Sequence, residues 1–237
     1  MPKPKKKGFL RRSAGWLAGV VFKIALALAL LTTAQVLAVR FVNPPLTLRM
    51  AWQWAGDQLA ERPYHRPAYH WRSLERISPH LRKAVLAAED QRFVEHHGFD
   101  FIEMRNALSD LFQYRRLRGA STITMQVART VYLLPSRSVS RKLVEAWYTV
   151  LIELLWDKER VLEVYLNTVD WGRLTMGAEA AANRYFNRPA MALTRQQAAL
   201  LAAVLPNPHR WEPQNPGARV RFRMAHILQD MDRMPLL

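Results

Sequence analysis

The clearest helical pattern in the sequence is the stretch 140–156, SRKLVEAWYTVLIELLW. Its apolar residues recur every three or four positions, so they fall on one stripe of a helix. The stripe is made of Leu143, Val144, Trp147, Val150, Leu151, Leu154 and Leu155. Such a stripe is typical of a helix that packs into a core, and we expect one here.

Helical patterns extend on both sides of this stretch, from residue 78 almost to the last residue. Each expected helix begins at a residue whose side-chain oxygen can accept a hydrogen bond from the first turn. These residues are Ser78, Asp100 with Glu103, Ser121 or Thr122, Asp157, and Thr194 with Gln197; a last helix is expected from about Gly217. We find no convincing pair of alternating strands, so the predicted class is mainly α.

The N-terminal region combines a basic tail, residues 1–15, with an apolar segment, residues 16–39, whose one charge is Lys23. This segment is long enough to cross a bilayer core as a helix. The positive-inside rule then leaves the tail in the cytoplasm and places residues 40–237 on the outer side. A signal peptide cleaved after Ala38 is the alternative, although the apolar segment is long for one.

Residues 40–77 are expected to connect this anchor to a folded domain at 78–237. The sequence Asn43-Pro44-Pro45 ends the first helix, because proline cannot continue it. Trp52 and Trp54 follow in an apolar group. Tryptophans close to a membrane exit often lie at the interface. A helix or strand of the core is an equally good interpretation.

The chain is strongly basic, with a formal net charge of +16. Residues 1–40 hold eight basic residues and no acidic one, which leaves 27 basic and 19 acidic residues elsewhere. A basic body suits nucleic acid, an anionic membrane or a phosphorylated substrate. Nucleic acid is not an expected partner, because no zinc-finger, RNP or helix-turn-helix pattern is present. The absence of cysteine excludes disulfides and thiolate metal sites.

The helix that begins at Ser78 ends in a polar group, EDQRF at 89–93, followed by His96 and Gly98. Glu89 lies four residues after Val85 and so continues its apolar face. A carboxyl group against an apolar wall has a raised pKa, which suits proton transfer. The alternative is a frayed helix end with solvated acids, which spacing alone slightly favours.

The helix at 140–156 carries a second polar group, Arg141 and Glu145, opposite its apolar stripe. Because the two residues are four apart, a surface ion pair worth a few tenths of a kcal/mol is one interpretation. The basic-before-acidic order is the less favourable one for such a pair. Tyr148 and Ile152 share this face, so the wall of a cleft is the other interpretation.

Between the two groups lies a basic stretch, RRLRGASTITMQ at 115–126. Free N–H groups at a helix N-terminus, with arginines nearby, attract phosphate. The glycine spacing and the lysine of a Walker loop are missing. The seven histidines show no HExxH spacing, so no metal ligand is assigned.

Taken together, these segments resemble the motifs of glycosyltransferase family 51. The matching positions are EDxxFxxHxG at 89–98, GxSTITxQ at 119–126, RKxxEA at 141–146, YLN at 165–167 and LPNP at 205–208. The resemblance covers about residues 78–230, with the motifs in family order. No Ser-x-x-Lys sequence of the transpeptidases occurs, and the length matches the monofunctional members of the family.

The resemblance implies a lysozyme-like, mainly helical domain with a cleft beside the membrane. Its substrate would be lipid II, a disaccharide-peptide on undecaprenyl pyrophosphate, polymerised into β-1,4-linked glycan strands with inversion and release of the pyrophosphate carrier. The implied location is the bacterial inner membrane, with a periplasmic catalytic domain. Membrane lipid and other cell-wall synthesis proteins would be partners. A divalent cation could assist at the pyrophosphate, although no ligand set is evident.

The resemblance also assigns roles to residues. Glu89 matches the general base that deprotonates the 4-hydroxyl of the acceptor sugar. Glu145 matches a second glutamate, which would help the leaving group depart or hold cationic groups. Arg129 and Arg141 match basic positions that would offset charge on the departing pyrophosphate. The other expected substrate-binding residues line or support the cleft: Asp90, Phe93, His96, Ser121, Thr122 and Gln126.

Three positions depart from the family pattern. Met125 stands where glutamine is common, Thr130 where asparagine is frequent, and Arg129 replaces the commoner lysine. The change at Arg129 keeps the charge. The other two remove amide groups, which puts their local contacts in doubt but neither carboxylate.

Two other functions stay open. A lysozyme-like lytic transglycosylase would need one acid in a glycan cleft, and it leaves Glu145 and the basic stretch unexplained. A catalytically idle membrane scaffold of the cell-wall machinery is suggested by Met125, Thr130 and the anchor.

Overall fold

The structure is a computed structural model that describes residues 7–61, 63, 65–115, 119–136, 138–172 and 174–237. The predicted basic tail lies partly, and the arginine-rich start of the stretch at 115–126 mostly, outside the described residues. Contacts divide the chain into two compact units, residues 1–42 and residues 43–237. Each unit is described by itself.

The first unit is the helix α1, Lys7–Phe41. Its part Gly15–Phe41 is 27 residues long with a mean hydropathy of 2.1, which is enough to cross a membrane. Large apolar side chains are exposed along this part, among them Trp16, Phe22, Leu30 and Phe41. A helix that is apolar on all sides suits a lipid environment, so α1 is compatible with the expected anchor.

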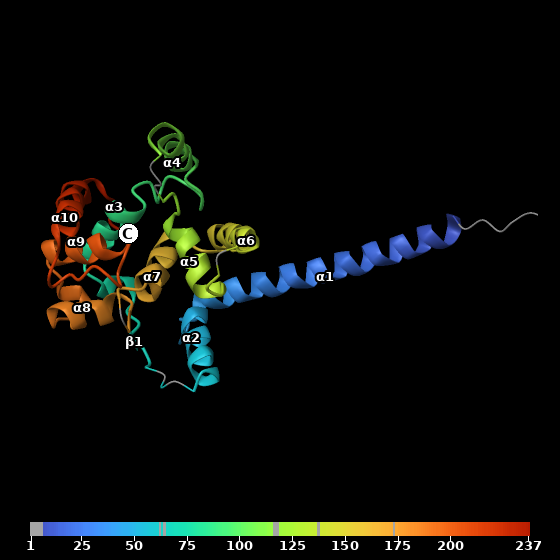
Figure 1. Cartoon of the computed structure of the whole chain (residues 1–237), viewed down its shortest axis with the longest axis horizontal. Coiled ribbons are helices and arrows are strands. Elements are labelled where there is room, and N and C mark those ends of the chain that lie inside the picture. Colours follow the sequence, from blue (N-terminus) through green and yellow to red (C-terminus); the bar gives the residue numbers. More distant parts are fainter. Residues whose placement is uncertain (1–6, 62, 64, 116–118, 137, 173) are drawn as a thin grey trace, which may run out of the picture. The chain divides into compact units, whose positions relative to one another are not determined.

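The second unit is built almost entirely from helices, which confirms the predicted mainly α class (Figure 1). Its α-helices are α2 (Leu48–Leu59), α3 (Pro79–Glu89), α4 (Phe101–Tyr114), α5 (Ile123–Tyr132), α6 (Val139–Leu155), α7 (Lys158–Thr168), α8 (Ala178–Phe186), α9 (Arg195–Val204) and α10 (Ala218–Asp230). Short 3-10 turns lie at Leu74–Arg76, Ala190–Ala192 and Met231–Arg233.

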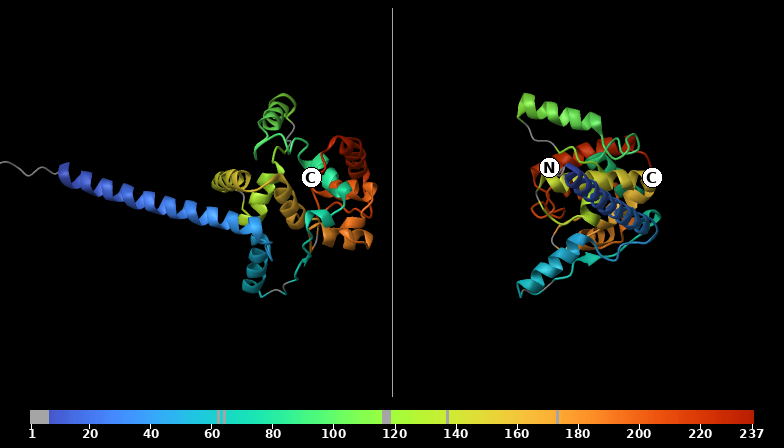
Figure 2. Two further views of the ribbon diagram at one scale, coloured as in Figure 1. Left: turned by 180° about the vertical axis from the view of Figure 1, so that it is seen from behind. Right: turned by 90° about the vertical axis from the view of Figure 1, so that its right-hand side faces the viewer.

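Two groups of helices make the core. Helices α3, α9 and α10 pack against one another, and α5 packs against both α6 and α7 (Figures 1 and 2). Helix α9 contributes four buried alanines, Ala198, Ala199, Ala202 and Ala203. Side chains this small allow neighbouring helices to approach closely. Trp171 is fully buried, and its indole nitrogen donates to the carbonyl of Leu201 at 3.1 Å.

The predicted helix starts are confirmed by their caps. The side chains of Ser78, Asp100 and Asp157 each accept a hydrogen bond from a backbone N–H in the following turn. Thr122, rather than Ser121, caps α5. Thr194 and Gln197 form a complete capping box at the start of α9. Caps depend on residues a few positions apart, which is why the sequence alone locates them.

One short strand pair was not predicted. Strands β1 (Ala68–Tyr69) and β2 (Thr175–Met176) are parallel, with Ala68 opposite Thr175. Strands of two residues are too short to show an alternating pattern in the sequence. The two strands thus connect the segment after α2 to the segment just before α8.

The orientation predicted for the apolar stripe at 140–156 is wrong. Helix α6 exposes most of that stripe, and Leu143 and Leu154 are 70% and 75% exposed. The buried side is the opposite one, which contains Glu145, Tyr148, Thr149 and Ile152. An amphipathic pattern shows that the two faces of a helix differ, but not what covers each face. Here α5 packs against the face of α6 that combines polar and apolar residues.

Helix α4 also exposes apolar residues. None of its residues is buried, and it stands away from the other helices of the second unit in every view (Figures 1 and 2). Its exposed large apolar side chains are Phe101, Ile102, Met104, Leu108, Leu111 and Phe112. The second unit therefore presents apolar surface on both α4 and α6.

In the expected connector, α2 buries Met50 and packs on α5. Trp52 and Trp54 are about half exposed, at 53% and 52%. The interpretation as part of the core therefore holds for Met50 and is wrong for the two tryptophans.

Candidate active site

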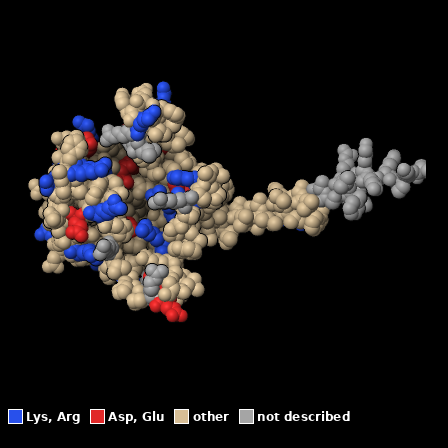
Figure 3. Space-filling view, in the orientation of Figure 1, with Lys and Arg blue, Asp and Glu red and all other residues tan. Residues whose placement is uncertain are grey.

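A cavity of about 570 Å³ opens among the ends of α3 and α9, the starts of α4 and α5, and the side of α10. Its lining residues are Ala87–Arg92, Asp100, Glu103, Gly119–Thr122, Gln126, Arg129, Leu205, Pro206 and Arg223. It thus brings together six predicted site residues: Glu89, Asp90, Ser121, Thr122, Gln126 and Arg129. Figure 3 shows a hollow beside α4 with acidic side chains inside it and lysine and arginine side chains around it.

Glu89 is the last residue of α3 and is half-buried at the cavity wall. Loss of hydration by burial is the largest influence on its carboxyl group and raises its pKa. The side-chain amide of Gln126 donates to Glu89 Oε2 at 3.1 Å, which partly offsets this rise in pKa. The interpretation as a frayed end with solvated acids is therefore wrong for Glu89, and the carboxyl group suits proton transfer.

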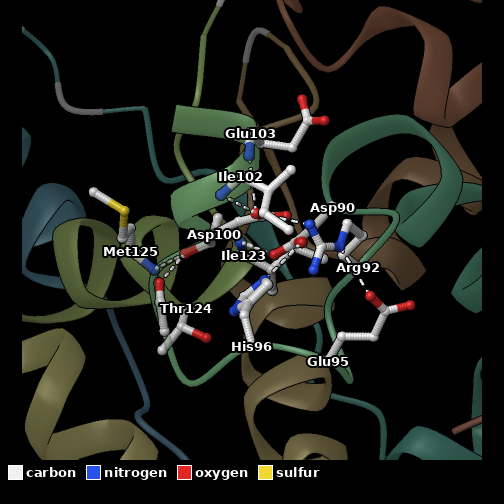
Figure 4. A network of polar contacts seen from close by, with 12 residues as sticks. Asp90, Arg92, Glu95, His96, Asp100, Ile102, Glu103, Ile123, Thr124 and Met125 are labelled. Atoms are coloured by element: carbon white, nitrogen blue, oxygen red, sulfur yellow. Dashed lines mark hydrogen bonds and ion pairs between the residues drawn. The ribbon is translucent and has the colours of Figure 1, made fainter. Parts of the chain in front are cut away.

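Asp90 fastens the loop after α3 to the start of α5. One carboxylate oxygen accepts from the backbone N–H of Ile123 at 2.9 Å, and the other lies 2.9 Å from His96 Nε2 (Figure 4). All of these groups are buried, so the hydrogen bonds hold the loop firmly. The Phe93 ring is buried edge-on to the His96 ring. Asp90, His96 and Phe93 thus fix the position of Glu89.

Gly98 and Thr122 join the same loop to α6 and α5. The Thr122 hydroxyl donates to the carbonyl of Gly98 at 2.6 Å and accepts from the backbone N–H of Met125. Gly98 has a positive φ of 83°, and a Cβ there would lie 2.7 Å from Thr149 Cγ2. A side chain at residue 98 would therefore meet both backbone strain and a steric clash.

A partly buried ion pair next to the loop after α3 was not predicted from the sequence. Lys158 Nζ contacts both oxygens of Glu153 at 2.9 Å, donates to the carbonyl of His96 and lies 4.5 Å from the centre of the Phe93 ring. The Thr124 hydroxyl donates to Glu153 at 2.5 Å. These contacts could not be predicted from the sequence, because they join residues of α5, α6 and α7 to the loop after α3.

Three buried side chains, Asp90, His96 and Asp100, are close enough to hold a metal ion, with donor atoms within 4.8 Å of one another. Their contacts do not favour one. Asp90 already binds His96 and the N–H of Ile123, and Asp100 Oδ1 caps α4 by accepting from Ile102 and Glu103 (Figure 4). We interpret these three side chains as a hydrogen-bonded cluster that holds the loop after α3 in place. We do not assign them as ligands of the divalent cation that could assist at the pyrophosphate.

The second predicted pair forms a separate cluster on α6. Glu145 is fully buried, and its two oxygens accept from Arg141 Nη1 and Lys142 Nζ, both at 2.5 Å. The interpretation as a surface ion pair is therefore wrong. Among the described residues that line the cavity, neither Arg141 nor Glu145 occurs. The two carboxylates of the prediction thus lie in different surroundings.

Helix α5 links the cavity to this cluster. Arg129 lines the cavity, and Tyr132, one turn later, stacks on Tyr148 of α6 with ring centres 4.6 Å apart. Met125 is buried within α5 and is not among the described lining residues. The methionine at position 125 therefore changes packing behind the cavity rather than its surface.

Arg223 is a lining residue that the sequence analysis missed. It comes from α10, far along the chain from the matching motifs around Glu89. Arg219 and Arg221 lie on the same helix, so nothing in the sequence distinguishes Arg223 from them. Only the packing of α10 on α3 and α9 brings it to the cavity.

A family model described as Transglycosylase matches residues 56–232. The chain belongs to the transglycosylase family. The family resemblance seen in the sequence is thereby confirmed, and the helical second unit is the lysozyme-like domain expected of this family.

Relatives of this transglycosylase match over most of their length. A biosynthetic peptidoglycan transglycosylase of Shewanella oneidensis is 42% identical over 227 residues, covering 95% of this chain and 94% of the relative. One of Ectopseudomonas mendocina is 46% identical over 225 residues, covering 95% and 91%. One of Pseudomonas aeruginosa is 44% identical over 211 residues, covering 89% and 90%.

Proposed function

We propose that this transglycosylase polymerises lipid II into β-1,4-linked glycan strands and releases undecaprenyl pyrophosphate. Family membership and the names of relatives at 42–46% identity support this substrate class. The observation that carries the proposal is the half-buried Glu89, with its raised pKa, at a cavity that also holds arginines.

Glu89 acts as the general base. Its carboxylate takes the proton of the acceptor sugar's 4-hydroxyl while that oxygen forms a bond to the anomeric carbon of the donor. The bond from that carbon to the pyrophosphate oxygen breaks, and the electron pair leaves with the pyrophosphate. A carboxylate with a raised pKa accepts this proton more readily than an ordinary one, and such catalysis contributes about 10²–10⁴-fold.

Arg129, Gln126 and Ser121 are the proposed substrate contacts within the cavity. Arg129 would offset negative charge on the pyrophosphate, since a guanidinium matches phosphate oxygens in geometry as well as charge. The Thr122 hydroxyl already makes two hydrogen bonds inside the protein, so we assign it to support rather than to substrate. Asp90, Phe93 and His96 have the same supporting role.

Glu145 acts by holding cations rather than by exchanging a proton. Each of its oxygens accepts a hydrogen bond from a cationic side chain, which fixes Arg141 and Lys142 at the surface of α6. Fixed cations stabilise charge that develops on a leaving group without reorganising during the reaction. Of the two roles considered for Glu145, the geometry favours this one.

The enzyme works at the outer face of the inner membrane. The apolar α1 serves as a single-pass anchor with its N-terminus in the cytoplasm, and the domain from residue 43 onward is periplasmic. Exposed apolar residues on α4 and α6 give this domain a surface that lipid can cover. Such a surface suits an enzyme whose substrate carries a lipid tail.

An assay with the purified full chain in detergent tests the proposal. Lipid II should be consumed, and long β-1,4-linked glycan should form. Degradation of preformed glycan without lipid II consumption would favour the lytic alternative. Binding of cell-wall synthesis proteins without turnover of either substrate would favour the scaffold.

A further inference from the structure

Helix α10 contributes one wall of the cavity through Arg223. Arg223 Nε donates to the carbonyl of Ala203, near the end of α9, at 3.2 Å. The same side chain lines the cavity, so this bond anchors the guanidinium at the cavity wall. Arg219 and Arg221, on the same helix, are exposed and do not occur among its described lining residues.

Contacts within the protein determine the position of Arg223. Helix α10 packs on both α9 and α3, the helix that ends at Glu89. The Gln91 side chain, two residues after Glu89, donates to Asp230 at the end of α10 at 3.2 Å. The carboxylate and the guanidinium are thus held on two elements that are fastened to each other.

Charged and titratable groups from several surrounding elements act on Glu89. Asp90 adjoins it in the chain, Arg129 comes from α5, Arg223 from α10, and Tyr165, whose hydroxyl is buried, from α7. Asp90 raises the pKa of Glu89, and the two arginines lower it. Of these charges, Arg223 has the largest influence, ahead of Asp90 and Arg129.

This balance matters because Glu89 must lose its proton before it can act as a base. Burial alone favours the protonated carboxyl group, which cannot accept a proton. A fixed cation nearby favours the ionised form.

We propose that Arg223 is a positioning residue, whose guanidinium, held by the carbonyl of Ala203, keeps Glu89 ionised and oriented in the free and substrate-bound enzyme. This inference rests on the proposed role of Glu89 as general base. Arg223 acts through Glu89, so its loss affects the rate of turnover and its pH dependence rather than the binding of lipid II.

The test measures kcat and KM for lipid II between about pH 5 and pH 9 with the full chain in detergent. Arg223→Gln should move the acid limb of the kcat profile upward by about one pH unit, the effect of one partly buried charge. At pH values on that limb kcat should fall by about tenfold. KM should stay within about twofold. Arg223→Lys keeps the charge, so its acid limb should lie close to the pH position found for the natural chain.

Arg221→Gln is the matched control, since it removes an exposed arginine from the same helix, and it should leave the profile unchanged. Thermal unfolding shows whether each variant is folded. If Arg223→Gln does not fold, Arg223→Met is measured in its place, because methionine keeps the apolar part of the side chain. An unchanged acid limb in folded Arg223→Gln would overturn the inference, as would a rise in KM with an unchanged limb, which indicates direct substrate binding.

Glu89→Gln separates this inference from the proposed function. If Glu89→Gln is inactive and Arg223→Gln shows a normal profile, Glu89 remains the base and the role of Arg223 is refuted. If Glu89→Gln is nearly as active as the natural chain, the proposed base itself is refuted, and the inference about Arg223 with it.

Discussion

At the scale of single residues, the site depends on how burial and fixed charge act on Glu89. The direction of its pKa shift can be tested through the pH dependence of protein stability as well as of activity. A carboxyl group with a higher pKa in the folded than in the unfolded state prefers to be protonated when folded. Ionisation at neutral pH therefore destabilises the fold, increasingly as the pH rises through the unfolded and then the folded pKa.

Glu89→Gln should therefore raise the midpoint of thermal unfolding at neutral pH by a few degrees. Glutamine has nearly the same shape and carries no charge to bury. Calorimetry at neutral pH and at about pH 4, where the carboxyl group of either state is largely protonated, gives the comparison. A gain in stability that is no larger at neutral pH than at acidic pH would contradict the raised pKa.

Arg141 belongs to the proposed leaving-group side. Arg141→Ala should weaken binding of pyrophosphate analogues, because it removes a cation that Glu145 holds in place. It should also lower stability by about 1–3 kcal/mol, because the fully buried Glu145 then keeps only Lys142 as a cationic partner among the described residues. Titration calorimetry measures the affinity, with Arg221→Ala as control. Unchanged affinity in a folded Arg141→Ala would count against this role.

At the scale of elements, the helix starts were predictable and the side on which α6 packs was not. Caps such as Ser78 and Thr122 depend on neighbours within one turn, so the sequence identifies them. The buried face of α6 depends on α5, which precedes it by a separate loop. Arg223 and Lys158 were missed for the same reason, since packing between distant elements gives each its role. The family motifs, by contrast, located most of the cavity lining.

Gly98 tests how tightly the loop after α3 is held against α6. Gly98→Ala should destabilise the protein by about 2–4 kcal/mol, because the residue has a positive φ and the new Cβ would clash with Thr149 and Glu153. Gly217→Ala is a matched control, since a Cβ there meets no described atom within 4 Å. Thermal unfolding measures both variants. Equal stability of the two would contradict the close packing at Gly98.

At the scale of the whole molecule, the apolar faces of α4 and α6 support the proposal that the domain from residue 43 onward contacts lipid. The chain has no cysteine, so a single introduced thiol can be labelled uniquely. A polarity-sensitive dye on Leu154→Cys should report an apolar environment when the full chain is in lipid nanodiscs. The same dye on Glu159→Cys, at the exposed start of α7, should report water. Aqueous signals from both positions would refute lipid contact at α6.

One comparison of variants decides whether Glu89 is the base of a lipid II polymerase. Glycan formation from lipid II is measured for the natural chain, for Glu89→Gln, and for Glu159→Gln, which neutralises an exposed carboxylate. Glu89→Gln should lose at least about 10²-fold in rate while still binding lipid II, and Glu159→Gln should polymerise normally. Polymerisation by Glu89→Gln at nearly the natural rate would show that Glu89 is not the base.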